Sequence, residues 1–384
     1  MRRVSICVAA VALLAGCGGS AAPSVAPVAS SAAAKPSAAT SAGASAKPSA
    51  AASAAASAKP SAAASAQASG VAGASAAGKL EPLKTAYGGA VILQIPLWTA
   101  IDAGMFKKYG FDPATPILAS GRTALDQLIA GQVDLIGAGP YASALGVGSG
   151  AKTRMMAVFS NKEPFDIYSV SSITSPEQLI GKTVATSGPA SESATAFNLY
   201  LKKVGIDQNK ITFLTEATTS DQQVAILSGQ VQAIAATPPL LQPEIAAKLH
   251  LLNDLTKSDI AWNPNGFHVA QTVVDSEPEK AVRMLEALEE GGAYAYNNPD
   301  FTKSLVKKYM KMDDSYLQEA YDNYKSLQAK NLQPSQAALD TVMGQVLDNQ
   351  KNMTKEKIQP FYTSKILDQL KASGFLDKSG APGS

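Results

Sequence analysis

Short apolar runs alternate with amphipathic segments along residues 83–238. Apolar runs bounded by Gly and Ser predict buried strands, whereas apolar residues that recur every three or four positions predict helices. One alternating series covers residues 83–160, and a second of similar length covers residues 182–238. Such alternation predicts an α/β protein with two lobes of similar construction, each built on a largely parallel sheet.

The predicted elements follow from this pattern and its glycine stops. In the first series we expect strands over residues 83–89, 115–120, 132–140 and 154–160, and helices over 95–110, 121–131 and 141–148. In the second we expect strands over 182–188, 210–217 and 231–238, and helices over 192–205 and 221–229. Beyond the segment of residues 266–299 the pattern is purely helical. Its stripe of Tyr309, Leu317, Tyr321 and Tyr324 is interpreted as core packing.

A ten-residue stretch occurs in two similar copies. Residues 131–140 read GQVDLIGAGP, and residues 229–238 read GQVQAIAATP. Each copy predicts the end of a helix, a buried strand, and small residues before a proline that can begin the next helix. Because ligands of open α/β sheets lie at the carboxyl ends of strands, we expect ligand there. Asp134, at the helix-to-strand entrance, is predicted to accept backbone amides, and Gln232 to make a similar bond without charge.

The N-terminal 79 residues are unlike the rest. Two arginines, an apolar run over residues 4–14 and Leu14-Ala15-Gly16-Cys17 predict a secretory signal whose cleavage leaves a lipidated Cys17. The alternative is an ordinary signal with a chance cysteine. Residues 18–79 are almost wholly Ala, Ser, Pro and Gly, which predicts a disordered tether. We therefore expect an exported protein that its acylated Cys17 anchors to a lipid bilayer.

Composition excludes several classes of protein. Of the 33 Lys and Arg residues, five precede Lys79, which leaves 28 against 31 Asp and Glu. A mildly acidic body without a basic stripe argues against a nucleic-acid partner. Both cysteines lie within the first 17 residues, and the only histidines, His250 and His268, lack metal-ligand spacing. No disulfide, cysteine nucleophile, metal site or cofactor is expected.

Several segments together resemble the solute-binding proteins of ABC importers for nitrate, taurine, aliphatic sulfonates and thiamine-pyrimidine precursors. They are IPLWTAIDAGMFKKYGFDPATPI, ALDQLIAGQVDLIG, ITSPEQLIGKTVAT, LKKVGIDQNKITFL and PFYTSKILDQLKASG, and the resemblance covers about residues 82–370. The resemblance implies a type II periplasmic-binding fold, with a ligand cleft between lobe one (80–169 plus 268–384) and lobe two (170–267). It also implies a monomeric receptor that gives a small-molecule ligand to an ABC permease in the membrane.

The candidate ligand-binding residues lie mainly at predicted strand ends and helix starts. Free amides and partial positive charge there suit an anionic or strongly polar solute. The candidates are Tyr87, Gly88, Gln94, Arg122, Thr123, Gly139, Tyr141, Ser187, Gly188, Ser191, Thr237 and Trp262. For Arg122 the alternative is a solvated side chain, for the serines plain helix capping, and for Trp262 a loop anchor. Trp98 is predicted to belong to the core.

Two other functions stay open. Ala236-Thr237-Pro238 stands where several sulfonate and taurine receptors carry a Trp-acid-Pro triplet, so their ligands do not transfer to this chain. An enzyme like the thiamine-pyrimidine synthases would need a cofactor lysine and a histidine-rich site, which two isolated histidines argue against. A ligand sensor for a membrane signalling partner is the third possibility.

Overall fold

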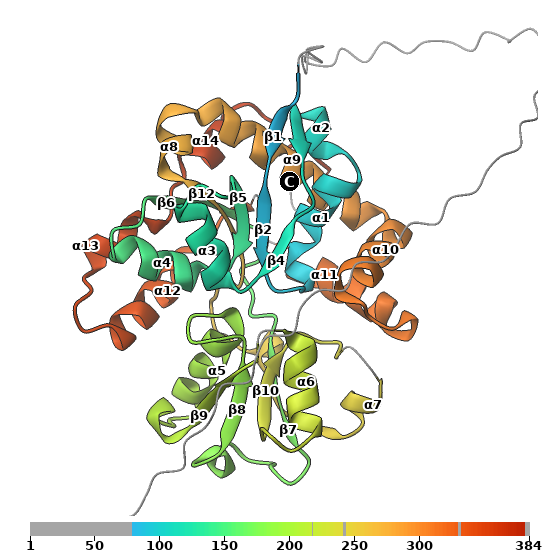
Figure 1. Cartoon of the computed structure of the whole chain (residues 1–384), viewed down its shortest axis with the longest axis vertical. Helices are drawn as coiled ribbons and strands as arrows, with labels where there is room; N and C mark the ends of the chain where they lie inside the picture. The colour runs from blue at the N-terminus through green and yellow to red at the C-terminus, as the bar shows by residue number, and fades with distance from the viewer. Residues whose placement is uncertain (1–78, 217, 241–242, 329–331, 381–384) are drawn as a thin grey trace, which may run out of the picture. The chain divides into compact units, whose positions relative to one another are not determined.

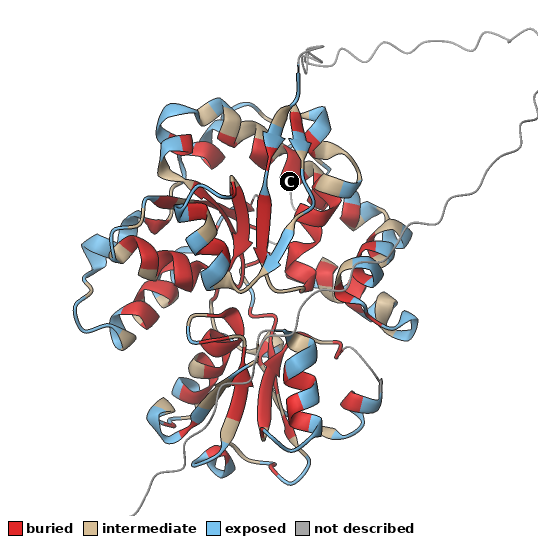
Figure 2. Ribbon diagram, viewed as in Figure 1, coloured by how far each residue is buried: buried red, intermediate tan, exposed pale blue. Residues whose placement is uncertain are grey.

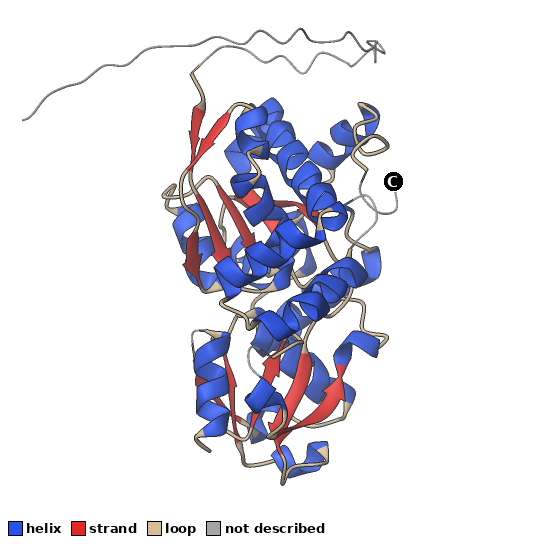
Figure 3. Ribbon diagram, turned by 90° about the vertical axis from the view of Figure 1, so that its right-hand side faces the viewer, coloured by secondary structure: helices blue, strands red, loops and turns tan. Residues whose placement is uncertain are grey.

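A computed structural model describes residues 79–216, 218–240, 243–328 and 332–380. The predicted signal, Cys17 and all of the predicted tether except Lys79 lie outside these residues. The described residues contain two five-stranded sheets, with helices packed against the strands (Figures 1 and 3). No helix among them is long and apolar enough to cross a bilayer.

The first sheet has the strand order β4-β2-β5-β12-β6. β2 pairs in parallel with β4 and β5, whereas β12 runs antiparallel to β5 and β6. The strands are β2 (Thr85–Gly88), β4 (Ile117–Ala119), β5 (Leu135–Ala138), β6 (Thr153–Val158) and β12 (Gly266–Ala270). A separate parallel pair, β1 (Glu81–Leu83) and β3 (Phe111–Pro113), was not expected from the sequence.

The second sheet has the order β11-β7-β10-β8-β9. β8 pairs in parallel with β9 and β10, and β7 runs antiparallel to β10 and β11. The strands are β7 (Asp166–Val170), β8 (Thr183–Thr186), β9 (Thr212–Thr215), β10 (Ala233–Ala236) and β11 (Leu249–Asp254). Edge strand β11 was missed because its sequence, LHLLND, has no clean alternation of apolar and polar residues.

Helices follow the predicted series with one break. The helix expected over residues 95–110 is divided into α1 (Ile95–Asp102) and α2 (Met105–Lys108), because Gly104 adopts a left-handed φ of 77°. The other helices of the two series are α3 (Gly121–Ile129), α4 (Pro140–Gly148), α5 (Glu192–Lys203), α6 (Thr219–Leu227) and α7 (Pro243–Ala246).

From Gln271 onward the described residues form helices, which confirms the prediction for the part beyond residue 299 and adds α8 and α9 before it. These are α8 (Gln271–Ser276), α9 (Pro278–Asn297), α10 (Pro299–Met310), α11 (Leu317–Leu327), α12 (Gln336–Asn349), α13 (Lys355–Ile358) and α14 (Lys365–Ala372). Short 3₁₀ turns are η1 (Ile92–Gln94), η2 (Pro176–Leu179), η3 (Gln208–Lys210), η4 (Leu255–Lys257), η5 (Asp314–Tyr316) and η7 (Gln359–Phe361).

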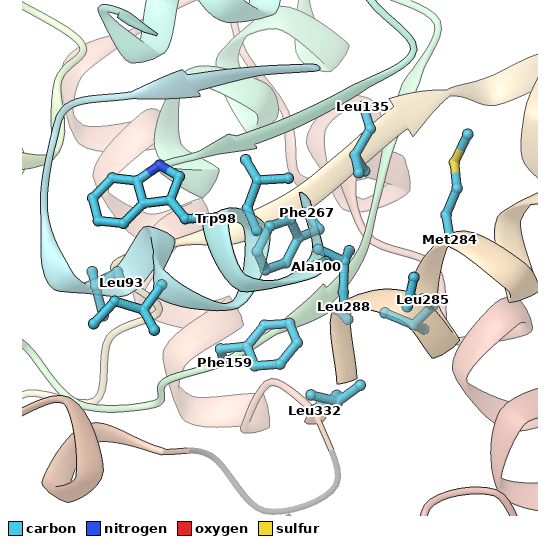
Figure 4. Close-up of a cluster of buried hydrophobic side chains, with 14 of the residues drawn as sticks. Leu93, Trp98, Ala100, Leu135, Phe159, Phe267, Met284, Leu285, Leu288 and Leu332 are labelled. Carbon is cyan, nitrogen blue, oxygen red and sulfur yellow. The ribbon is translucent and has the colours of Figure 1, made fainter. Parts of the chain in front are cut away.

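The largest apolar cluster joins the first sheet to the C-terminal helices. Trp98 is fully buried in it, as predicted, and stacks on Tyr309 with 4.6 Å between ring centroids. Phe159 and Phe267 pack edge to face nearby (Figure 4). The central strands of both sheets are buried along their length (Figure 2). This packing holds the strand ends in place.

The chain passes between the two sheets twice. The first passage lies between Val158 and Asp166, because β7 already belongs to the second sheet; the expected boundary at residue 169 falls inside that strand. The second passage lies between Lys257 and Gly266. A bridge between Lys162 and Ala261 joins the two passages.

Candidate functional site

Three glycines, Gly88, Gly121 and Gly139, lie close together at the strand ends of the first sheet. A Cβ on Gly88, at the end of β2, would lie 2.8 Å from the α-carbon of Gly121. A Cβ on Gly121 would in turn lie 4.0 Å from the backbone nitrogen of Gly139, which caps α4. The ends of β2 and β5 and the start of α3 therefore meet at one edge, where the position of Gly88 has no room for a side chain.

Residue Glu192 reaches this edge from the second sheet. It is the first residue of α5, and a Cβ on Gly139 would lie 2.6 Å from its Cγ. Its side chain is buried, and its Oε1 has no hydrogen-bond partner. Burial raises the pKa of Glu192 well above the ordinary value, and the charge of Glu163 raises it further.

Glu163 lies on the first passage between the sheets and is 2% exposed. Its Oε1 accepts the backbone N–H of Phe165 at 3.1 Å, while Oε2 has no partner. Burial raises its pKa to about 8, against a smaller opposing effect of the Phe165 N–H, and the charge of Asp166 adds to the rise. The two carboxyl groups therefore favour their protonated forms near neutral pH.

The predicted residue Gln94 lies on the same side of β5 as Glu192. Its Nε2 donates to the carbonyl of Gly137 at 3.1 Å and approaches Asn265 Oδ1 at 3.5 Å. Its Oε1 lies against the α-carbon of Gly137 and is buried without a partner. Gln94 and Glu192 thus contact positions two residues apart in the chain, Gly137 in β5 and Gly139 just after it.

The predicted serines around the start of α5 mainly satisfy one another. Ser191 caps the helix by accepting the N–H of Ala194 at 3.2 Å, and its hydroxyl donates to the carbonyl of Gly188 at 2.8 Å. The N–H of Ser187 donates to Ser193 Oγ at 2.9 Å. Helix capping therefore occupies these hydroxyls, although the segment stands beside Glu192.

Four other predicted residues are buried near the strand ends. Tyr87 packs edge-on against Trp98, and its pKa is raised by burial. Tyr141 and Trp262 belong to one apolar cluster. Thr237 follows β10 and is 6% exposed. Their burial is compatible with walls of a closed site and equally with core packing.

Arg122 and Thr123 lie at the start of α3 and are exposed. The Arg122 guanidinium pairs with Asp126 one turn along the helix at 3.1 Å. Thr123 is hydrogen-bonded to Ser120, which caps α3. The guanidinium that the sequence suggested for an anion therefore already has a carboxylate partner.

Sequence reasoning missed both glutamates. Glu192 was quoted within the hydroxyl-rich stretch TSGPASES, but an acidic residue in a first helical turn is ordinarily a solvated partner of the helix dipole. Glu163 lies in a connecting segment without periodicity. The available signal was the pair of glycines at 137 and 139, which marked a place where other groups approach the strand closely.

Among the described residues, no group of three or more His, Cys, Asp or Glu side chains could hold a metal ion. His268 donates from Nε2 to the carbonyl of Ala138 at 3.1 Å; burial lowers its pKa to about 4 and keeps it neutral.

Two hollows lie apart from these strand ends. One of about 380 Å³ is lined by Ser172, Ile173, Gln178, Lys182 and Gln232. Another of about 210 Å³ lies between α5 and α12 and includes Asn198, Gln345 and Asn349. Neither is lined by a predicted ligand residue.

Residues 94–302, more than half of the chain, match the family model described as NMT1/THI5 like. The chain belongs to this family. The matched region begins at Gln94 and contains both copies of the repeat, both glutamates and both passages between the sheets.

Known relatives agree with this assignment. A Brucella abortus protein, provisionally named a binding protein, is 25% identical over 61% of this chain and 73% of its own length. The alkanesulfonate-binding protein SsuA of Xanthomonas axonopodis, bound to MOPS, matches 75% of this chain and 99% of its own at 16% identity, with a TM-score of 0.61. The nitrate-binding protein NrtA of Synechocystis matches 79% and 93% at 14% identity, with a TM-score of 0.60.

These likenesses establish the fold. The protein has the type II periplasmic-binding fold, which it shares with the periplasmic sulfonate-binding and nitrate-binding proteins. The fold is not confined to receptors: a variant of the enzyme DszB, in complex with biphenyl-2-sulfinic acid, matches 78% of this chain at 17% identity, with a TM-score of 0.55.

Proposed function

We propose that this protein is a lipid-anchored receptor that binds a small polar organic solute between its two lobes and delivers it to an ABC importer. The observation that carries the proposal is the meeting of the two sheets at Gly139 and Glu192, where the predicted strand ends of one lobe touch the first residue of α5 from the other. A ligand that touches both sides stabilises the closed form by its differential affinity for it.

The second copy of the repeat supports closure in the same way. The carbonyl of Pro238, just after β10, accepts a hydrogen bond from Asn323 Nδ2 of α11 at 3.0 Å. Each copy of the repeat is therefore contacted at its end by an element of the other lobe. In the proposed cycle, both contacts form on closure and break on opening, while the two passages between the sheets bend.

The anchor is proposed from the sequence alone. After cleavage before Cys17, acyl chains on that cysteine would hold the receptor at the membrane. If residues 18–79 form the tether that the sequence predicts, a flexible chain of that length would have a root-mean-square span of roughly 40–50 Å, enough for the body to meet a permease in the same membrane. Labelling of cells with a radioactive fatty acid tests the anchor, and a Cys17→Ser chain should lose the label.

Catalysis is not part of this proposal. The enzyme DszB shares the fold, but both cysteines of this chain precede the folded region, and the neutral His268 is held by the Ala138 carbonyl. No observation favours the sensor over the receptor.

Binding is tested with the purified chain by thermal shift and equilibrium dialysis. Candidates should include sulfonates, nitrate, carboxylates, amines and pyrimidines. A saturable ligand that is recovered chemically unchanged supports the receptor. No binding to any of these classes would count against it, and turnover of the ligand would favour an enzyme.

A further inference from the structure

Helix α12 joins the two lobes at a place of its own, apart from the two passages. It comes after the second passage and packs against α4, beside the first sheet. Leu199 of α5, a helix that packs on β10 of the second sheet, belongs to the same apolar cluster as α4 and α12. Figure 1 shows α12 between α4 and α5. A helix of the first lobe therefore contacts a helix of the second directly.

The C-terminal end of α12 adds polar contacts with the second lobe. Lys202 Nζ of α5 lies 2.6 Å from Asp348 Oδ2. Just beyond α5, Gln208 Nε2 donates to Asn349 Oδ1 at 2.8 Å. Asp348 and Asn349 are the last two residues of α12, so the end of this helix is the part that holds the other lobe.

The start of α12 is fixed to both passages. Asn161, on the first passage, accepts at Oδ1 the N–H of Ser335, the residue that caps α12, at 2.7 Å. The same oxygen accepts Nδ2 of Asn263, on the second passage, at 2.7 Å. Asn161 Nδ2 in turn donates to the Gln333 carbonyl at 2.9 Å. The 14 residues of α12 extend about 20 Å from this junction.

The two sides of α12 are packed differently. Toward α4 the helix is apolar, and Val342 and Val346 are fully buried in the shared cluster. Toward α5 a hollow of about 210 Å³ remains, lined in part by Asn198, whose Oδ1 is buried without a partner. The side chains of Lys202 and Asp348 are 70% and 55% exposed, and surface pairs of this kind contribute little to stability. Because apolar burial is the more costly contact to lose, we expect α12 to stay on α4 and to part from α5.

We propose that α12 is a latch on lobe closure: its start lies at the pivot, where both passages meet, and its end holds α5 in the closed form through Asp348 and Asn349 and releases it on opening. This inference rests on the proposed receptor function and concerns the control of closure. Contacts near a pivot move little as a hinge bends, whereas contacts at the far end of the helix separate. The latch favours the closed form with or without ligand, so it sets how much of the receptor is open for a ligand to enter.

The test measures the distance between the lobes in the ligand-free full chain by pulsed electron paramagnetic resonance. Both native cysteines are replaced by serine, and spin labels are attached to cysteines at the exposed Lys107 and Lys248, one in each lobe. We expect one main distance in the parent chain and a second distance in the Asp348→Ala, Asn349→Ala double variant. The ratio of open to closed form should rise about tenfold, since the double variant removes one hydrogen bond and one exposed ion pair.

A matched control breaks a similar contact inside one lobe. Lys307 Nζ lies 2.6 Å from Asp314 Oδ1, in an ion pair that is also exposed but lies within the C-terminal helices. Asp314→Ala should therefore leave the distance distribution of the parent chain unchanged. Thermal unfolding of the same samples shows that each variant is folded.

Two further changes test the latch from the α5 side. Lys202→Ala with Gln208→Ala breaks the same two contacts from the second lobe and should give the same second distance. Asn198→Leu should act in the opposite direction, because a leucine of similar volume removes the unpaired oxygen and adds apolar contact across the hollow. Added to the α12 double variant, it should lower the open fraction again.

Each outcome has a definite meaning. Identical distance distributions in the parent chain and the α12 double variant would overturn the latch, and so would an equal shift in Asp314→Ala. A shift from the α12 side without one from the α5 side would also overturn it. These distances are measured without ligand, so their failure leaves the receptor function standing. A chain that binds no solute but shows the expected distances would instead count against the receptor and not against the latch.

Discussion

The two copies of the repeat make the same contact where their strand begins and different contacts where it ends. The start of the strand is called the entrance below, and its end the exit. At the entrance, Asp134 Oδ2 accepts the backbone N–H of Lys84 at 2.8 Å, and Gln232 Oε1 accepts that of Thr183 at 3.1 Å. Each bond holds the start of the neighbouring parallel strand. An aspartate and a glutamine therefore perform the same structural task, one with charge and one without.

At the exit, the first copy has glycines where the second has Ala235 and Thr237. Gly137 and Gly139 leave room for the Gln94 and Glu192 side chains to lie against the backbone. The second copy keeps its own side chains, and its contact with the other lobe is a neutral bond from Asn323 to a carbonyl. The two strand ends therefore differ in how closely a side chain of the other lobe approaches the backbone.

The largest expected contrast is in pH dependence. Folded Glu163, with a pKa of about 8, keeps a proton that the unfolded chain loses near pH 4.5. Between about pH 4.5 and pH 8 the folded state therefore binds more protons than the unfolded state. The contribution of Glu163 to the free energy of unfolding is greatest below about pH 4.5 and falls as the pH rises to about 8. The limiting slope is about 1.4 kcal/mol per pH unit for each proton. Glu192 acts in the same direction.

Urea unfolding between pH 5 and 8 measures this effect. Glu163→Gln and Glu192→Gln should flatten the fall relative to the parent chain, while Asn323→Ser at the second exit should lower stability by a similar amount at every pH. Asp166 and Glu289, each with a pKa raised to about 7, also make the free energy of unfolding fall as the pH rises. His268, with its pKa lowered to about 4, makes it rise with pH. The difference between each variant and the parent chain isolates the contribution of Glu163 and Glu192. If the free energy of unfolding of variant and parent changed with pH in parallel, the raised pKa values of these two residues would be contradicted.

Adding a methyl group at the end of β5, in Gly137→Ala, should lower the free energy of unfolding more than removing one at the end of β10, in Ala235→Gly. In Gly137→Ala, the new Cβ would overlap Gln94 Oε1 and lie 3.4 Å from Phe267 Cε1. Overpacking of this kind costs about 2 kcal/mol, whereas Ala235→Gly should cost about 1 kcal/mol through backbone entropy. Denaturant midpoints at one pH compare the two; a smaller loss for Gly137→Ala would show that Gln94 moves aside freely.

The sequence predicted the fold far better than the site. Hydrophobic periodicity and glycines at helix ends were enough to predict the alternating strands and helices, because local sequence decides these elements. The position of Asp134 and Gln232, between a helix and a strand, also predicted that their hydrogen bonds are structural. The contacts of Gln94 and Glu192 with the end of β5, and the burial of Glu163, escaped prediction because they depend on distant segments that meet only once both sheets are formed. Arg122 illustrates the converse, since Asp126, one helical turn away, supplies its partner.

The smallest contrast is at the shared entrance. Asp134→Ala and Gln232→Ala each leave one backbone N–H without its side-chain acceptor, and each should lower the free energy of unfolding by about 1 kcal/mol. Neither should change ligand affinity, because both lie at the opposite end of their strands from the exits. Exchanging the two residues, Asp134→Gln with Gln232→Asp, should restore most of the stability, since either side chain can accept the same N–H. If the exchange instead alters binding, the entrance takes part in recognition, and the separation of structural entrance from functional exit fails.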